Sequence, residues 1–202
     1  MSFFQNTCKP KGIGGRLMVG MMNTGHSAMA EWGFTHLKIA ENDICLDIGC
    51  GGGANIKRLL EKSPNGKVTG IDYSEVSVEK SKKVNKAEIG NNRCEILQGN
   101  AAELPFKDET FDVVTAFETI YFWPDIDRSF KQVHRVLKSG GTFMICNEVN
   151  GENQKDEKWT KIVDGMKIYT AEQIEEFLKQ AGFTDIETDK DKSLLCTVCK
   201  KQ

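Results

Sequence analysis

The chain has 202 residues, a net charge of −2 at pH 7 and a pI of about 6.0. This length predicts a single domain, residues 1–202, with a core that needs no disulfides. Lysine and arginine are dispersed, so the basic face on which nucleic-acid binding depends is absent. No stretch approaches the roughly 20 apolar residues of a membrane span, and the first residues lack a signal-peptide core. We therefore expect a cytoplasmic protein with neither a nucleic-acid nor a membrane partner.

Residues 1–41 precede the first predicted strand and contain a helical pattern near 26–38. Beyond them, strands and helices alternate along the chain, which predicts a mostly parallel sheet covered on both faces. Gly140-Gly141 is expected to end a helix, and Thr170 to Gln173 form a capping box. We expect strands at 44–48, 67–71, 93–98, 111–117, 142–147, 183–188 and 193–200, and helices at 54–62, 75–89, 126–138 and 171–181.

The last two strands are joined by a short polar turn at 189–192, so one strand of the sheet should be antiparallel. The final strand contains the CxxC pair Cys196 and Cys199. Residues three apart on a strand point to opposite faces, so this pair is not suited to chelating one ion. The seven cysteines are scattered and do not suggest a disulfide framework. We expect no metal site, because no group of potential ligands has the required spacing.

A glycine-rich turn stands between the predicted strand 44–48 and the predicted helix 54–62. Residues 46–53 read Leu-Asp-Ile-Gly-Cys-Gly-Gly-Gly. Glycines suit a turn in which side chains would hold the backbone away from a ligand, and a helix N-terminus offers backbone N–H groups. Asp72 ends the next apolar run, 19 residues after Gly53, where a carboxylate can accept hydrogen bonds from both ribose hydroxyls. The pattern indicates a nucleoside-binding site.

Four segments in order resemble class I S-adenosylmethionine (SAM) dependent methyltransferases, of the small-molecule type called methyltransferase domain 11. The resemblance implies SAM as cofactor, a small-molecule substrate, and a Rossmann-like, doubly wound α/β sheet of seven strands. The implied strand order is 3-2-1-4-5-7-6 with strand 7 antiparallel. It also implies an N-terminal helical cover at 1–41 on a catalytic core at 42–202. The segments are LDIGCGGG at 46–53, GIDYS at 70–74, GNAAELPF at 99–106, and 111–125 running on to HRVLKSGG at 134–141.

The same resemblance assigns cofactor-binding residues. Asp47 would orient the ligand's ammonium group, Asp72 would bind the ribose, and Tyr73 would pack on the adenine. Asn100 stands where the family commonly has Asp, so its contact with the adenine amino group should be weaker, although its carbonyl oxygen still accepts. The implied cofactor site comprises Asp47, Gly49, Cys50, Gly51, Gly53, Asp72, Tyr73, Asn100, Ala101 and Phe117.

The segment after the fourth predicted strand, residues 117–125, is where an open α/β sheet binds ligands. Glu118 is a candidate catalytic group, and His26 is a second one if the N-terminal cover approaches the methyl group. Tyr121 and Trp123 are candidate substrate contacts, with packing as loop anchors the alternative. The segment lacks the motifs of adenine-amino, cytosine-C5 and protein-arginine methyltransferases. Segment 10–30, rich in glycine, is expected to close over the site as a lid.

Three other functions remain open. Gly49-x-Gly51-x-x-Ala54 also matches the dinucleotide fingerprint of nicotinamide-dependent oxidoreductases, but Asp47 is a SAM-type feature and no Tyr has Lys four residues on. A non-catalytic SAM-binding protein would share the whole cofactor half. Methylation of a protein, or of a metalloid such as arsenite at cysteine thiolates, is less favoured because most cysteines fall in predicted strands or the glycine turn.

Overall fold

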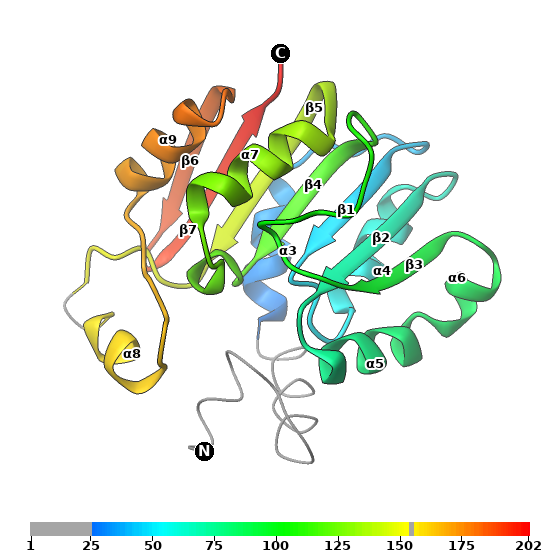
Figure 1. The fold of residues 1–202 in the computed structure, drawn as a ribbon, viewed down its shortest axis with the longest axis horizontal. Helices are drawn as coiled ribbons and strands as arrows, with labels where there is room; N and C mark the ends of the chain where they lie inside the picture. The colour runs from blue at the N-terminus through cyan, green and yellow to red at the C-terminus, as the bar shows by residue number, and fades with distance from the viewer. Residues whose placement is uncertain (1–25, 154–155) are drawn as a thin grey trace.

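The computed structural model describes residues 26–153 and 156–202. Residues 1–25 of the predicted cover, and with them most of the predicted lid at 10–30, lie outside the described residues. In the described part of the chain, seven strands form one sheet in the order β3-β2-β1-β4-β5-β7-β6 (Figure 1). The strands are β1 (Ile44–Ile48), β2 (Lys67–Asp72), β3 (Cys94–Gln98), β4 (Phe111–Phe117), β5 (Leu137–Asn147), β6 (Thr184–Asp191) and β7 (Leu194–Lys200).

The first five strands pair in parallel, whereas β7 pairs antiparallel with both β5 and β6. The predicted strand order and the antiparallel last strand are therefore confirmed. The antiparallel pairing of β6 with β7 follows from the short turn that joins them, as the sequence predicts. Parallel strands end at a common edge, and the carboxyl ends of β1, β2 and β4 meet at the lower edge in Figure 1.

Helices cover both faces of the sheet. Helices α7 and α9 pack on one face, and α3 and α4 pack on the other (Figure 1). The helices are α3 (Ser27–Thr35), α4 (Ala54–Lys62), α5 (Glu75–Val84), α6 (Lys86–Gly90), the 3₁₀ turn η1 (Ile120–Phe122), α7 (Ile126–Val136), α8 (Glu157–Ile162) and α9 (Ala171–Gln180). The capping box predicted for the last helix is present at Thr170 and Gln173.

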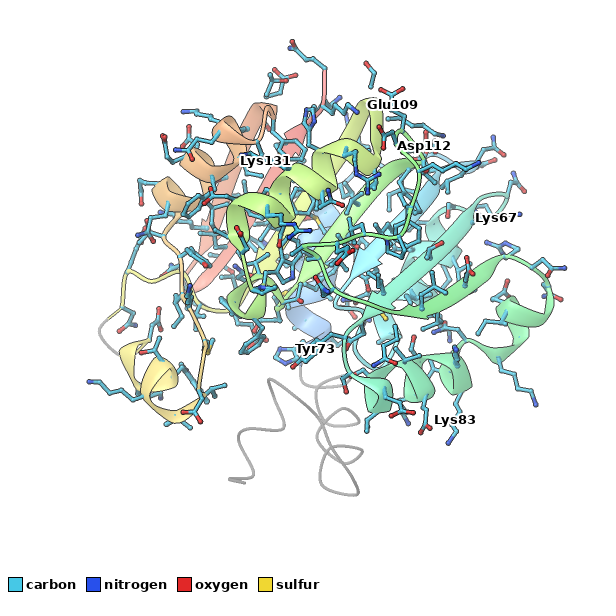
Figure 2. The ribbon with its side chains drawn as sticks, viewed as in Figure 1. Lys67, Tyr73, Lys83, Glu109, Asp112 and Lys131 are labelled. Carbon is cyan, nitrogen blue, oxygen red and sulfur yellow. The ribbon has the colours of Figure 1, made fainter. Side chains whose placement is uncertain are left out.

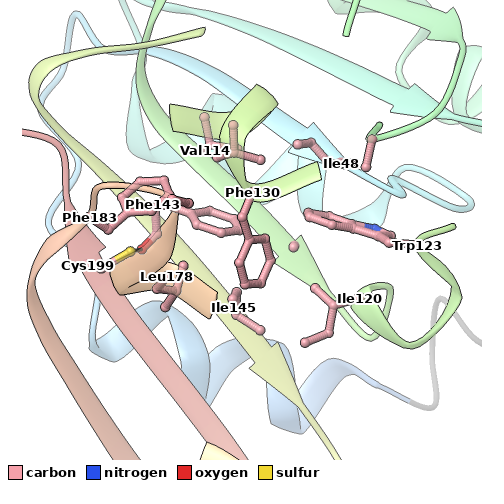
Figure 3. Close-up of a cluster of buried hydrophobic side chains, with 14 of the residues drawn as sticks. Ile48, Val114, Ile120, Trp123, Phe130, Phe143, Ile145, Leu178, Phe183 and Cys199 are labelled. Atoms are coloured by element: carbon pink, nitrogen blue, oxygen red, sulfur yellow. Dashed lines mark hydrogen bonds between the residues drawn. The ribbon is translucent and has the colours of Figure 1, made fainter. Parts of the chain in front are cut away.

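The core beneath α7 is aromatic. Phe130 of α7 is fully buried, and its ring lies 5.7 Å from those of Trp123 and Phe143 (Figure 3). Side chains along a strand alternate between the two faces of the sheet, so they pack in two different hydrophobic cores. Cys199 of β7 packs in this aromatic cluster, whereas Cys196 packs on the other face. The prediction that the CxxC pair is split between two faces is confirmed.

Helix α3 contributes to the second core. Its residues Met29, Ala30 and Phe34 are buried, and the ring of Phe34 lies 5.0 Å from that of Phe117. Most of the helix is packed on the sheet, and its first turn reaches the cavity at the carboxyl-end edge, where His26 and Met29 line it. The expected cover at 1–41 stays a prediction, because residues 1–25 lie outside the described residues.

Three local predictions were wrong. The helix expected at 75–89 divides at Asn85, whose side-chain amide donates to the carbonyl oxygens of Gly53 and Ser81, each at 3.1 Å. The helix expected at 126–138 ends at Val136, because Leu137 turns to extended backbone and pairs with Phe111. Gly140-Gly141 therefore lies inside β5.

The loops also differ from expectation. β6 runs through Asp191, so the hairpin turn is shorter than the predicted 189–192. Between β5 and α9 the chain forms the short helix α8, for which the sequence pattern predicted no element.

Gly53 allows the close approach between the glycine turn and α5. Its φ is +82°, and a Cβ there would lie 2.4 Å from Ser81 Oγ and 2.5 Å from Asn85 Nδ2. Gly90, at the end of α6, has no neighbour within 4 Å of its Cβ position. The same substitution, Gly to Ala, can be made at both positions, so Gly90 serves as the control for Gly53.

We predict that Gly53→Ala lowers the free energy of unfolding by roughly 2–4 kcal/mol, from backbone strain and overpacking together. Gly90→Ala should be neutral or slightly stabilising, because Ala favours helix more than Gly does. Urea unfolding of both variants checks this. Equal stabilities for the two would contradict the packing described for Gly53.

Candidate functional site

A cavity of about 410 Å³ opens at the carboxyl ends of β1, β2, β3 and β4. Its size falls in the range of small-molecule sites. In Figure 2, Tyr73 marks this edge of the sheet, whereas Lys67 and Asp112 mark the opposite edge. The walls come from the glycine turn, the ends of the strands and the first turn of α3. Predicted site residues lining it are His26, Gly49, Cys50, Gly51, Asp72, Tyr73, Asn100, Ala101, Phe117, Glu118 and Trp123.

The glycine turn follows β1 and is held against the end of β2. The N–H groups of Gly49 and Cys50 both donate to the carbonyl oxygen of Ile71, at 2.7 and 3.1 Å. Gly49 has a φ of +76°, and a Cβ there would lie 2.0 Å from Thr119 Oγ1. Glycine is therefore required at position 49 because the β4 loop packs directly on the turn. Gly53 does not line the cavity, since its contacts are with α5.

Asp72 connects the glycine turn to the end of β2. One carboxylate oxygen accepts from the Gly51 N–H at 2.9 Å, and the other accepts from the Ser74 N–H at 2.8 Å. The side chain is 7% exposed and faces the cavity. Burial raises the pKa of this carboxyl group, and the two N–H groups oppose that rise. The Ser77 side chain also bonds to this carboxyl group. An ionised carboxylate offers about four acceptor sites in all, so these three bonds do not use its full capacity.

Asp47 lies behind the cavity wall. It is 2% exposed and accepts from the Thr115 hydroxyl at 2.8 Å. Burial raises its pKa to about 7, although the Thr115 bond lowers it. The residue does not line the cavity, so any contact with a ligand there would be indirect.

A cluster of one histidine and two glutamates lies at the cavity wall, and two of its members, His26 and Glu118, line the cavity. Glu118 follows β4, Glu148 follows β5, and His26 precedes α3. One carboxylate oxygen from each glutamate and one ring nitrogen of His26 all lie within 4.8 Å of one another. His26 Nδ1 lies 2.8 Å from Glu148 Oε1. The backbone N–H of Glu148 and the Tyr121 hydroxyl both donate to Glu118 Oε1. Sequence spacing could not indicate this cluster, because its members are far apart in the chain.

The cluster has unusual proton affinities. Burial raises the pKa of Glu118 to about 7, while the nearby His26 lowers it. The hydrogen bond to Glu148 raises the pKa of His26, against the effect of burial. Glu118 also has a φ of +56°, a left-handed backbone that is uncommon outside glycine. Strained backbone and shifted pKa values together are frequent at functional sites.

Comparison with known proteins adds to this geometry. Residues 39–195 match a family model described as a methyltransferase domain. The chain is also 31% identical over 166 residues to YrhH of Bacillus subtilis, which is named as a methyltransferase without a stated acceptor; the match covers 82% of each chain. The chain belongs to the class I SAM-dependent methyltransferase family.

One further relative and one solved structure compare with this methyltransferase. The sterol 4-C-methyltransferase strm-1 of Caenorhabditis elegans is 31% identical over 159 residues, which are 74% of this chain and 43% of that protein. The chain thus spans less than half the length of that relative. A chain of the complex between the Haloferax volcanii Trm112 methyltransferase activator and a methyltransferase has a TM-score of 0.80 at 21% identity, covering 91% and 93% of the two chains. That likeness confirms the fold.

The aromatic run after β4 serves mainly as an anchor in this methyltransferase. Tyr121 is 2% exposed and does not line the cavity; its hydroxyl bonds to Glu118 and contacts Val149. Trp123 reaches the cavity wall, but its ring packs in the core and its Nε1 donates to Thr119 Oγ1 at 3.2 Å. Phe122 also lines the cavity.

Some cavity residues were not foreseen. Arg58 of α4 lines the cavity and donates to Ser27 Oγ at 2.6 Å, with Glu31 at 3.8 Å. Thr119 lines it as well. Arg58 lies one helical turn after Ala54, at the start of the helix that follows the glycine turn, and this position was the feature of the sequence that could have predicted its place in the cavity wall.

None of the helices in the described part of the chain has the length and apolar character that a membrane span needs.

We predict that Asp47→Asn removes a pH-dependent loss in the free energy of unfolding. The native pKa of Asp47 is about 7, whereas that of the unfolded chain is about 4. Between these values the unfolded chain releases a proton that the native state keeps, so the free energy of unfolding falls as pH rises. Asn retains an acceptor for Thr115 and carries no charge.

Relative to wild type, the Asp47→Asn protein without ligand should therefore gain stability between pH 4 and pH 8, by a few kcal/mol at most. Chemical denaturation of both proteins across this pH range measures the difference. A difference that does not change with pH would show that Asp47 is not buried as described.

Proposed function

We propose that the chain binds SAM in this cavity and transfers its methyl group to a small-molecule acceptor. The observation that carries this proposal is the content of one cavity: the glycine turn with Asp72 and the side chains of Glu118 and His26 all line it. A nucleoside-binding turn beside groups that can hold an acceptor or its proton is an arrangement that suits methyl transfer to a small molecule.

The described residues fit the cofactor. A Cβ on Gly51 would meet only a backbone oxygen at 4.0 Å, so the turn presents bare backbone to the cavity. Asp72 lines the cavity and keeps acceptor capacity for the ribose, and Tyr73, 37% exposed, lines the same cavity where it would cover the adenine. The proposed contacts are Gly49, Cys50, Gly51, Asp72, Tyr73, Asn100, Ala101 and Phe117, with Asp47 and Gly53 supporting the turn from behind.

SAM, when bound, supplies a methyl group on a positively charged sulfonium. The work of this chain is then to align the acceptor atom with the methyl group and to exclude water. Phe117 and Trp123 give that end of the cavity an apolar wall, and Met29 of α3 covers it. Residues 1–41 would act as a cover and 42–202 as the catalytic core, with Glu118 and His26 as catalytic groups. Trp123 in the cavity wall would contact the substrate, whereas Tyr121 lies behind the wall and would act only through its hydrogen bond to Glu118.

The names of the relatives support a small-molecule acceptor with an apolar part. They include sterol methyltransferases and the demethylmenaquinone methyltransferase of Lactobacillus johnsonii. Incubating the protein with methyl-labelled SAM and a metabolite extract, followed by mass spectrometry, tests transfer directly. Labelled product in the extract supports the proposal; binding of SAM without any labelled product would favour a non-catalytic SAM-binding protein.

We predict that SAM and S-adenosylhomocysteine raise the melting temperature, whereas NAD does not, because a ligand that binds only the native state stabilises it. Asp72→Ala should weaken SAM binding by roughly 2–4 kcal/mol through loss of two charge-assisted hydrogen bonds. Calorimetric titration measures this.

Asp112→Ala is the matched control. Asp112 likewise holds a backbone N–H, that of Ile44 at 2.9 Å, but it lies at the opposite edge of the sheet (Figure 2). This variant should lose stability and keep its SAM affinity. Unchanged affinity in Asp72→Ala, or equal losses in both variants, would refute the ribose assignment.

Asn100 provides a second test of the cofactor site. Its Oδ1 accepts from the Ala102 N–H at 2.9 Å, which a carboxylate can also do. We predict that Asn100→Asp binds SAM as tightly as wild type or more tightly, because a charged oxygen is a stronger acceptor for the adenine amino group. A tenfold or larger loss of affinity in the same titration would mean that Asn100 acts as a donor.

A further inference from the structure

His26 and Glu148 form a pair that bridges two distant parts of the chain at the cavity wall. His26 caps the N-terminus of α3, and Glu148 follows the last residue of β5. Their side chains meet at 2.8 Å through Nδ1 and Oε1 and are 30% and 37% exposed. Glu148 carried no expected role in the sequence, since it lies in a polar stretch with no motif.

The pair sets the tautomer of the imidazole. A carboxylate accepts hydrogen bonds and does not donate when ionised, so the proton of neutral His26 must reside on Nδ1. Nε2 is then the basic nitrogen of a ring that lines the cavity. A histidine oriented by a carboxylate in this way is the common arrangement for accepting a proton from a reacting group.

The charges around His26 favour this role. Glu148 and Glu118 both raise its pKa, and Tyr121 contacts Glu118 from the far side. The cation on the same wall, Arg58, is engaged with Ser27 and Glu31 of α3. In the described part of the chain, no Lys or Arg forms an ion pair with Glu118 or Glu148. A positive charge arising on His26 would therefore be stabilised by Glu148 and by the ionised form of Glu118.

We propose that His26, held by Glu148, accepts the proton that the acceptor loses on methylation, so that the methylated atom is an oxygen, nitrogen or sulfur bearing a weakly acidic proton. This inference rests on the proposed function. The acceptor lone pair forms a bond to the methyl carbon, and the carbon–sulfur bond breaks with its electron pair staying on sulfur. The acceptor proton passes to Nε2, so one positive charge leaves the sulfonium and one appears on His26.

Glu148 is thus a positioning residue, and the chain offers a matched control. His36, at the other end of α3, pairs with Asp189 at 2.9 Å. His36 does not line the cavity. The two His–carboxylate pairs share one helix but differ in their access to the site.

The test needs no knowledge of the acceptor. Histidine-labelled protein is titrated by NMR without ligand, with S-adenosylhomocysteine and with SAM, which differ by the sulfonium charge. We expect neutral His26 to carry its proton on Nδ1, and its titration midpoint to lie about 0.5–1 pH unit lower with SAM than with S-adenosylhomocysteine, because the added charge is nearby. The midpoint of His36 should not change. Glu148→Gln should lower the midpoint of His26 alone, and Asp189→Asn that of His36 alone.

The outcomes separate this inference from the function beneath it. If neither ligand binds, the proposed function fails. If both bind but the midpoint of His26 is the same with each, His26 does not face the methyl group and the inference fails, whether or not the Glu148 variant folds. Selective broadening of the His26 signals by equimolar MnCl₂ would also overturn it, because the cluster would then be a cation site. Retention of the Nδ1 tautomer with the expected midpoints supports it.

Discussion

The site depends on one buried carboxylate. Asp72 accepts one N–H from the glycine turn and one from the start of α5, so the turns after β1 and β2 are held in a fixed relation. Asp72 also lines the cavity, so the group that holds the loops together is also the group that we propose as the ribose acceptor. Gly49 and Gly53 allow this arrangement, because a Cβ at either position would clash with Thr119 or Ser81.

The cavity concentrates groups that are costly to bury. Asp47 and Glu118 both have pKa values raised to about 7 by burial. Such groups lower the stability of the protein without ligand, since a charged form in a poorly hydrated site lacks compensation. A ligand with a cationic sulfonium and ammonium would supply that compensation. The buried carboxyl groups of Asp47 and Glu118 therefore lower the stability of the ligand-free protein at the edge of the sheet where we propose that the cationic cofactor binds.

The sequence predicted the strands well, because apolar runs are local patterns. It also predicted that the glycine turn and Asp72 belong to one site, and the structure brings them together at one cavity. What it missed depends on contacts across the chain. Asn85 divides a helix because it reaches Gly53, and Leu137 starts a strand early because it pairs with Phe111. Glu148 lies beside His26 because it directly follows β5 in the folded sheet. The two residues are far apart in the sequence, so no motif spacing could have predicted the contact.

We propose that SAM lies across the carboxyl ends of β1, β2 and β3 with its methyl end toward His26, Glu118 and Glu148. A crystal structure with S-adenosylhomocysteine tests this most directly. We expect the ribose hydroxyls on the Asp72 carboxylate, the adenine between Tyr73 and Ala101, and the sulfur facing Glu118 and His26. Binding elsewhere, or with the sulfur directed away from this cluster, would contradict the account.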